Sequence, residues 1–208
     1  MTKVLFFDIG YTLVNEDAVW KRRCEEQAET AEAKALGLTA EDIYREIEAA
    51  SRIGAGQFRS VLRKLQIKEA APYRHELETL YDDAPQVLEA LCQRYELGII
   101  ANQADGLRER LDGWGILRYF THIVSSFDAK ITKPDIRIFE YALNAANCPP
   151  ESAFMIGDRL DNDIIPAKAA GMKTIWIKQG FGALQQASCD ADMPDHTVEG
   201  LSELLNIF

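Results

Sequence analysis

Short, almost uninterrupted apolar runs alternate along this chain with longer stretches in which apolar residues recur at helical spacing. Five runs are rich in β-branched or aromatic residues and predict strands: KVLFFD (3–8), LGIIAN (97–102), HIVSS (122–126), AFMIGD (153–158) and KTIWIK (173–178). Helical patterns lie between them at 84–95, 135–146 and 162–171. Apolar strands separated by helices are typical of a parallel sheet covered on both faces. We therefore expect an α/β fold with a doubly wound, Rossmann-like sheet.

Residues 16–80 interrupt this alternation, because they contain helical patterns and no convincing strand. Three helical stretches, separated by turn signals, lie at 16–37, 39–54 and 56–65. The simplest interpretation is a helical cap inserted after the first strand. We accordingly predict two parts: a cap subdomain formed by 16–80, and an α/β core domain formed by 1–15 and 81–208.

Two further segments are interpreted from their polar residues. The basic run Lys21-Arg22-Arg23 is followed by Glu25 and Glu26, which favours a solvated helix face over a phosphate site. The segment 187–197 is expected to form a polar loop before a final short helix.

Composition restricts the kind of partner. With 208 residues, the chain can hold one core and a smaller appended part. The net charge of −10 argues against nucleic acid or an anionic membrane as partner, because both need a basic surface. The apolar run at the start is too short for a signal peptide, and none approaches the ~18 residues of a spanning helix. Four scattered cysteines predict reduced thiols and a cytoplasmic protein; the sequence specifies no oligomeric state.

Polar residues gather where the predicted parallel strands end. Asp8 ends the first strand, Asn102 and Gln103 follow the second, and Asp158 ends the fourth, while Lys133 lies in a loop between them in sequence. Ligands of open α/β sheets bind outside the carboxyl ends of the strands, so these side chains are expected to converge on one crevice. Asp161 and Asp163 follow Asp158 within one helical turn.

Four sequence motifs, in this order, resemble those of the haloacid dehalogenase (HAD) superfamily in its branch with an inserted helical cap: FFDIGYTLV, LGIIANQ, TKPD and MIGDRLDND. The resemblance covers essentially the whole chain. It implies a Mg²⁺-dependent hydrolase that acts on a small phosphorylated metabolite. Asp8 would be the nucleophile and form an aspartyl-phosphate that water hydrolyses. Lys133 would pair with Asp8 and with the transferring phosphoryl group.

The same resemblance implies the remaining site residues. Asp8, Asp158 and the backbone carbonyl of Gly10 would bind Mg²⁺, which prefers hard oxygen ligands. Asp163, or else Asp161, would hold metal-bound water or orient Lys133. The side chain of Asn102 and the backbone amides of residues 102 and 103 could bind phosphate oxygens. Pro134 is expected to start the following helix.

Two positions depart from the pattern of the superfamily. Its phosphatases usually carry a general-acid Asp two residues after the nucleophile, where this chain has Gly10. The second motif usually ends in Ser or Thr, where this chain has Ala101. We expect weakened acid–base function and low or specialised activity, since a positioned acid or base contributes ~10²–10⁴-fold. Glu16 and Asp17 are the nearest substitutes in sequence.

Two alternatives compete with the phosphatase hypothesis. Related branches cleave carbon–halogen bonds or phosphonates without the second Asp, the latter through a cap lysine, for which Lys21, Lys34, Lys64 and Lys68 are available. The other alternative is a non-catalytic protein that binds a phosphorylated ligand or a partner.

Overall fold

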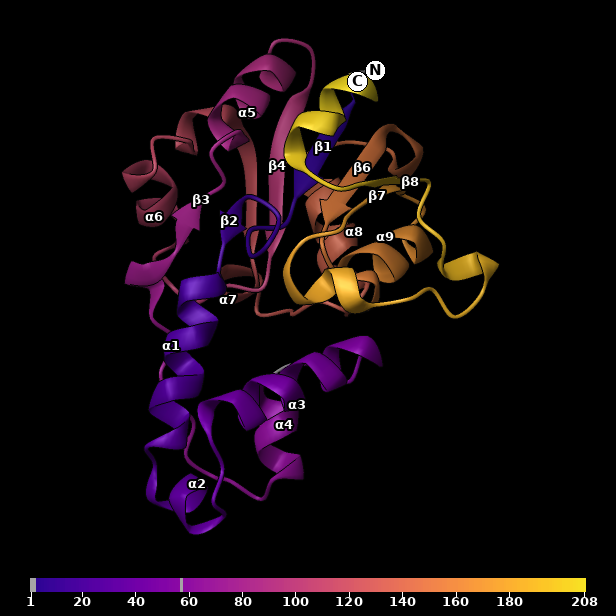
Figure 1. Cartoon of the computed structure of the whole chain (residues 1–208). Coiled ribbons are helices and arrows are strands. Elements are labelled where there is room, and N and C mark those ends of the chain that lie inside the picture. The colour runs from indigo at the N-terminus through magenta and orange to yellow at the C-terminus, as the bar shows by residue number, and fades with distance from the viewer. Residues whose placement is uncertain (1–2, 57) are drawn as a thin grey trace.

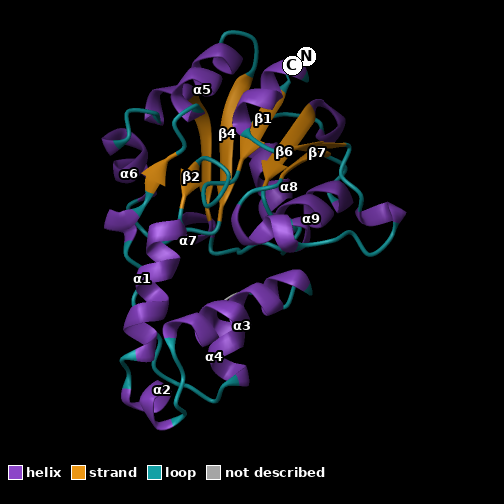
Figure 2. Ribbon diagram, in the orientation of Figure 1, coloured by secondary structure: helices purple, strands orange, loops and turns teal. Residues whose placement is uncertain are grey.

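The computed structural model describes residues 3–56 and 58–208. A parallel sheet of six strands forms its centre, in the order β5-β4-β1-β6-β7-β8 (Figures 1 and 2). The strands are β1 (Val4–Phe7), β4 (Glu96–Ala101), β5 (Phe120–Ser125), β6 (Ala153–Gly157), β7 (Lys173–Ile177) and β8 (His196–Val198). The strand of the first motif, β1, lies between those of the second and fourth motifs, because it pairs with both β4 and β6. The predicted α/β fold is confirmed.

Alternating side chains divide the core between the two faces of the sheet. Leu5 and Phe7 of β1 join one apolar cluster with α5 (Ala84–Cys92), α6 (Leu107–Gly113) and the 3₁₀-helix η7 (Leu201–Asn206). Val4 and Phe6 point the other way, into a cluster with α8 (Arg137–Ala145) and α9 (Ile165–Ala169). Successive side chains of a strand point to opposite faces, so a fully apolar strand needs cover on both.

Several local predictions were wrong. The segment 187–197 was predicted to be a polar loop, but its last two residues belong to β8 (His196–Val198). This strand pairs with β7 and forms the edge of the sheet. The helices α6 and α7 (Ser126–Ala129) were not predicted. Pro134 does not start a helix, because α8 begins at Arg137 after a turn. The predicted helix 162–171 is a π-helical turn, η4 (Leu160–Ile164), continued by α9.

The inserted helices lie below the carboxyl end of the sheet in Figure 1. They are α1 (Asp17–Ala28), α2 (Ala31–Ala35), α3 (Ala40–Arg52) and α4 (Phe58–Lys64). The predicted first stretch is two helices, because Thr30 leaves helical geometry and caps α2 through a hydrogen bond from Ala33 N. Thr39 and Asp42 form a capping box at the start of α3, where the sequence places a helix start.

Two features join these helices to the sheet domain. A short antiparallel ribbon of β2 (Val14–Asn15) and β3 (Thr79–Leu80) lies where the chain enters and leaves the insertion. The 3₁₀-helix η5 (Gly180–Leu184) packs against the insertion, where the ring of Phe181 makes an edge contact with Trp20 and the carbonyl of Phe181 accepts a hydrogen bond of 2.8 Å from Ser51 Oγ. None of the helices in the described part of the chain combines the length and apolar character needed to cross a membrane.

Candidate active site

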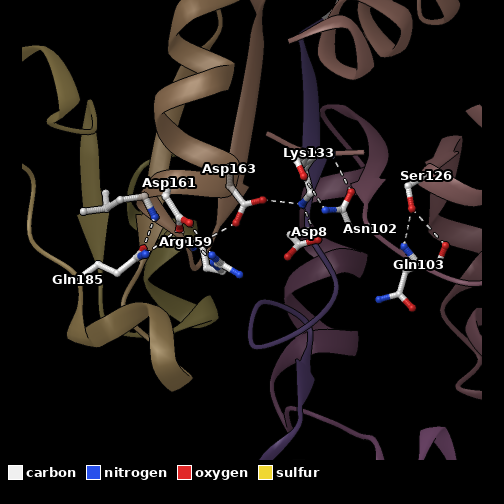
Figure 3. A network of polar contacts seen from close by, with 10 residues as sticks. Asp8, Asn102, Gln103, Ser126, Lys133, Arg159, Asp161, Asp163 and Gln185 are labelled. Carbon is white, nitrogen blue, oxygen red and sulfur yellow. Dashed lines mark hydrogen bonds and ion pairs between the residues drawn. The ribbon is translucent and has the colours of Figure 1, made fainter. Parts of the chain in front are cut away.

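A buried lysine lies between two aspartates at the carboxyl end of the sheet (Figure 3). Lys133 Nζ is 2.8 Å from Asp8 Oδ1 and 2.5 Å from Asp163 Oδ1. Asp8 follows β1, Asp163 lies in η4 after β6, and Lys133 comes from the loop before α8. Burial lowers the pKa of Lys133, but the charges of Asp163 and Asp8 outweigh burial and hold that pKa above its ordinary value. The ammonium group is therefore charged and fixed next to Asp8.

Asn102 is an exposed residue whose side chain holds the backbone of Lys133. Its Nδ2 donates to the carbonyl of Lys133 at 2.9 Å, and its Oδ1 accepts from the amide of Lys133 at 2.8 Å. The backbone amide of Gln103 donates to Ser126 Oγ at 3.1 Å. The side-chain oxygen of Gln103 accepts a hydrogen bond from Arg110. Asn102 and Gln103 both line the cavity beside Asp8, although these groups already have partners.

Three carboxylates meet at this end of the sheet. One oxygen from each of Asp8, Asp158 and Asp163 lies within 4.8 Å of the others. Asp158 is 2% exposed, and its Oδ1 has no hydrogen-bond partner within the described chain. Burial raises the pKa of Asp158 well above its ordinary range, and the charges of Asp163 and Asp8 add to this effect. A buried, unpartnered oxygen beside two further carboxylates fits a hard divalent cation such as Mg²⁺.

Asp163 and Asp161 occupy different environments. Besides Lys133, Asp163 accepts a hydrogen bond of 3.1 Å from the amide of Arg159. Asp161 instead pairs with the guanidinium of Arg159 and accepts a hydrogen bond of 2.6 Å from Gln185 Nε2. Of the two acids, Asp163 is therefore the one that touches Lys133.

The space beside Gly10 is filled by another acid. A Cβ built on Gly10 would lie 2.3 Å from Glu16 Oε1. Glu16 is 9% exposed and is held by Trp20 Nε1 at 2.9 Å and by the hydroxyl of Tyr73 at 2.7 Å. Burial raises the pKa of Glu16 to about 7, against these hydrogen bonds, which lower it. Glu16 and Asp8 line the same cavity of about 150 Å³, whereas Asp17 accepts a hydrogen bond from the hydroxyl of Tyr11.

Ala101 ends β4 inside the core and is fully buried. A hydroxyl side chain of the kind expected at the end of this motif is therefore absent from the site. The sequence pattern also gave no sign of Trp20 and Tyr73 as partners of Glu16. Tyr73 lies 57 residues further along the chain, so only the folded structure brings the two together.

The order of these residues along β1, β4 and β6 agrees with one known family. Residues 5–177 match the haloacid dehalogenase-like hydrolases. The chain belongs to this family.

Other HAD-family proteins show the range of similarity. The glyceraldehyde 3-phosphate phosphatase of Methanopyrus kandleri is 29% identical over 226 residues, which include 100% of this chain and 97% of the relative. The phosphoserine phosphatase of Thermus thermophilus is 32% identical over 176 residues, 83% of this chain and 67% of the relative. This chain is thus an enzyme of the HAD hydrolase class whose relatives include phosphatases.

A solved HAD structure supports the fold. HAD-hydrolase YfnB of Bacillus subtilis, in a crystal form bound to magnesium, superposes with a TM-score of 0.72 at 24% identity, covering 99% of this chain and 98% of YfnB. At this identity the likeness concerns the fold alone.

Proposed function

We propose that this HAD-family enzyme is a phosphatase that hydrolyses a small phosphorylated metabolite through an aspartyl-phosphate on Asp8 and requires Mg²⁺. The observation that carries the proposal is the contact of 2.8 Å between Lys133 Nζ and Asp8 Oδ1, beside the unpartnered carboxylate oxygen of Asp158. This arrangement gives a nucleophile, a fixed positive charge and a buried acid that a cation would balance.

In the first step, a carboxylate oxygen of Asp8 attacks phosphorus and the bond from phosphorus to the ester oxygen breaks. The positive charge of Lys133 offsets negative charge on the phosphoryl group as it transfers. Asp163 and Asn102 act on Lys133, the first by its hydrogen bond to Nζ and the second by holding the backbone. Water then attacks the phosphorus of the aspartyl-phosphate and releases phosphate from Asp8.

The carboxylates of Asp8 and Asp158 and the backbone carbonyl of Gly10 would hold the Mg²⁺. Mg²⁺ supplies positive charge that makes attack by one anion on another possible. Its binding would also relieve the repulsion between Asp158 and its two acidic neighbours. Asn102 and Gln103, which line the cavity beside Asp8, would contact the phosphate oxygens.

Glu16 is the carboxylic acid that can serve the leaving group in place of the missing side chain at Gly10. Its carboxyl group lies in the space of that side chain and lines the same cavity as Asp8. In this role Glu16 donates a proton to the leaving oxygen when the ester bond breaks. It then accepts a proton from the attacking water in the second step.

We further propose that residues 16–80 act as a cap over the site, with 1–15 and 81–208 as the core domain. The four cap lysines considered for phosphonate cleavage, Lys21, Lys34, Lys64 and Lys68, are all exposed. None of them lines the cavity beside Asp8 or the larger one between cap and core. This favours phosphate ester hydrolysis over a mechanism that needs a Schiff base on the cap.

The test is release of inorganic phosphate from acyl, aryl and sugar phosphates, with and without Mg²⁺. We expect Mg²⁺-dependent turnover that EDTA removes reversibly and that Asp8→Asn abolishes. Asp112→Asn is the control, because Asp112 is an exposed acid on α6. Turnover that persists after thorough removal of metal would contradict the proposal. Absence of turnover on every substrate, with binding of phosphate analogues retained, would favour the non-catalytic alternative.

A further inference from the structure

A second cavity, of about 450 Å³, opens between the cap and the core. It shares Glu16, Asn102, Gln103 and Arg159 with the smaller cavity beside Asp8, so the two are contiguous. The remaining wall comes mainly from the cap, with Trp20 and Arg23 on α1, Phe58 and Arg59 on α4, and Tyr73 and His75 after them. Whatever is attached to a phosphoryl group at Asp8 would therefore lie in this cavity.

Arg23 does not belong to a solvated helix face, and that prediction was wrong for this residue. Lys21 and Arg22 are exposed, but Arg23 is turned inward. The guanidinium carbon of Arg23 lies 3.8 Å from the centre of the Phe58 ring, and its Nε donates to the carbonyl of Ala71 at 3.1 Å. Stacking on the ring and one backbone acceptor fix the guanidinium while leaving its terminal Nη donors for a ligand.

The positive charge of this wall is not balanced by the protein. Neither Arg23 nor Arg59 forms an ion pair with a carboxylate in residues 3–56 and 58–208, whereas Arg159 pairs with Asp161. Burial and the neighbouring charge of Arg59 lower the pKa of Arg23. The one acid in the wall, Glu16, is bonded to Trp20 and Tyr73. Arg23 is half-buried and Arg59 is exposed, and both line this cavity without a carboxylate partner in the described part of the chain, so their guanidinium groups are available to an anion that enters it.

We infer that Arg23 and Arg59 form a subsite for a second anionic group on the substrate, either a carboxylate or a second phosphate. This rests on the proposed function and narrows its substrate class to phosphate monoesters whose leaving group is itself charged. Guanidinium groups bind both kinds of oxyanion through paired N–H donors. The aromatic rings of Trp20, Phe58 and Tyr73 would exclude water around the short link between the two anions.

The test compares matched substrates that differ in the second anion. Phosphoglycolate is compared with ethyl phosphate for a carboxylate, and a sugar bisphosphate with the corresponding monophosphate for a phosphate. We expect kcat/KM to favour the charged member of at least one pair, and Arg23→Met to reduce that preference by roughly 10- to 100-fold, through KM, because one charge-assisted interaction is lost. Arg23→Lys should restore part of the preference, and Arg59→Met should act as Arg23→Met does.

Matched controls separate the charge from a general loss of fold. Arg22→Met and Arg63→Met remove exposed arginines from α1 and α4 and should leave the preference unchanged. The pair that shows the preference tells whether the second anion is a carboxylate or a phosphate. Equal kcat/KM within both pairs, or a loss in Arg23→Met that affects the neutral substrate equally, would overturn the inference while leaving Asp8-dependent hydrolysis in place.

Binding provides a readout that does not depend on catalysis. In Asp8→Asn, calorimetry should show tighter binding of phosphoglycolate or the bisphosphate than of its matched partner, and Arg23→Met should remove the difference. If no substrate is hydrolysed but this difference is found, the proposed function fails and the anion subsite stands. If hydrolysis occurs and the difference is absent, the subsite fails and the proposed function stands.

Discussion

The carboxyl group of Glu16 occupies the space that a side chain on Gly10 would fill, with Oε1 2.3 Å from the position of the missing Cβ. Glu16, which directly follows β2, thus lines the same cavity as Asp8, the proposed nucleophile. Trp20 and Tyr73 each donate one hydrogen bond to Glu16, so two residues that are far apart in the sequence fix its position. This relationship determines how the chain is expected to respond to changes at either residue.

Glu16→Gln is expected to slow hydrolysis of alkyl phosphates by ~10²–10⁴-fold, because loss of a positioned proton donor has this effect. Aryl and acyl phosphates, whose leaving groups need little protonation, should be affected much less. The measurement is kcat over a series of leaving groups of increasing pKa. Glu25→Gln on the exposed side of α1 is the matched control. An equal loss on all leaving groups would mean that Glu16 only supports the structure.

Gly10→Asp restores the residue usual in the family, yet we expect no gain in turnover from it alone. The new side chain would collide with the carboxyl group of Glu16 and place a second negative charge there. Combined with Glu16→Ala, which frees the space, the same change should raise turnover above that of Glu16→Ala alone. The comparison needs all three variants and wild type on one alkyl phosphate. A clear gain in the single variant Gly10→Asp would show that Glu16 does not serve the leaving group.

Lys133→Met should abolish turnover and lower the free energy of unfolding by about 3–5 kcal/mol, as expected when one partner of a buried ion pair is removed. The loss arises because Asp8 and Asp163 would face each other at the sheet end without a compensating charge. Urea denaturation measures the stability, with the exposed Lys68→Met as control. An unchanged free energy of unfolding would indicate that these acids are balanced by another group.

Mg²⁺ should stabilise the folded protein by about 2.7 kcal/mol at a concentration 100 times its Kd. Asp158→Asn is expected to abolish this effect, since it removes the unpartnered oxygen, and to raise Tm in the absence of metal, since it removes repulsion among three acids. Asp161→Asn should keep the Mg²⁺ response, because Asp161 pairs with Arg159. Thermal unfolding with EDTA or Mg²⁺ distinguishes the two. A Mg²⁺ response that survives in Asp158→Asn would place the metal elsewhere.

Much of the fold could be read from the sequence because its strands are buried on both faces. A continuous apolar run such as Val4–Phe7 has few alternatives, and the residue that breaks it, Asp8, then falls at the sheet end. The edge strand β8 was missed because it is short, has two exposed residues of three and lies in a polar segment. Its place is set by pairing with β7, which no local pattern reveals.

In the candidate site, the residues at the ends of strands could be predicted from the sequence, whereas those on the inserted helices could not. Asp8, Lys133 and Asp158 lie at strand ends or in the adjoining loop, where topology alone brings them together. The direction of a side chain on one of the inserted helices could not be predicted in this way, because it depends on which residues of other elements pack against it. Arg23 turns inward onto Phe58, which lies on another helix, and the charge pattern of α1 gives no sign of this contact. The position of the Glu16 carboxyl group likewise depends on a hydrogen bond from Tyr73, which is distant in the sequence.

The ribbon of Val14–Asn15 and Thr79–Leu80 has a consequence for the order of events in a catalytic cycle. Asp8 and Lys133 belong to the sheet domain, whereas Trp20 and Tyr73, which hold Glu16, lie beyond the ribbon. A rotation of the helices about the ribbon would withdraw Glu16 and leave Asp8 and Lys133 in place. In the proposed mechanism, attack on phosphorus by Asp8 and proton donation by Glu16 would then become separate events. A substrate that does not draw the helices toward the sheet would meet Asp8 without Glu16 beside it.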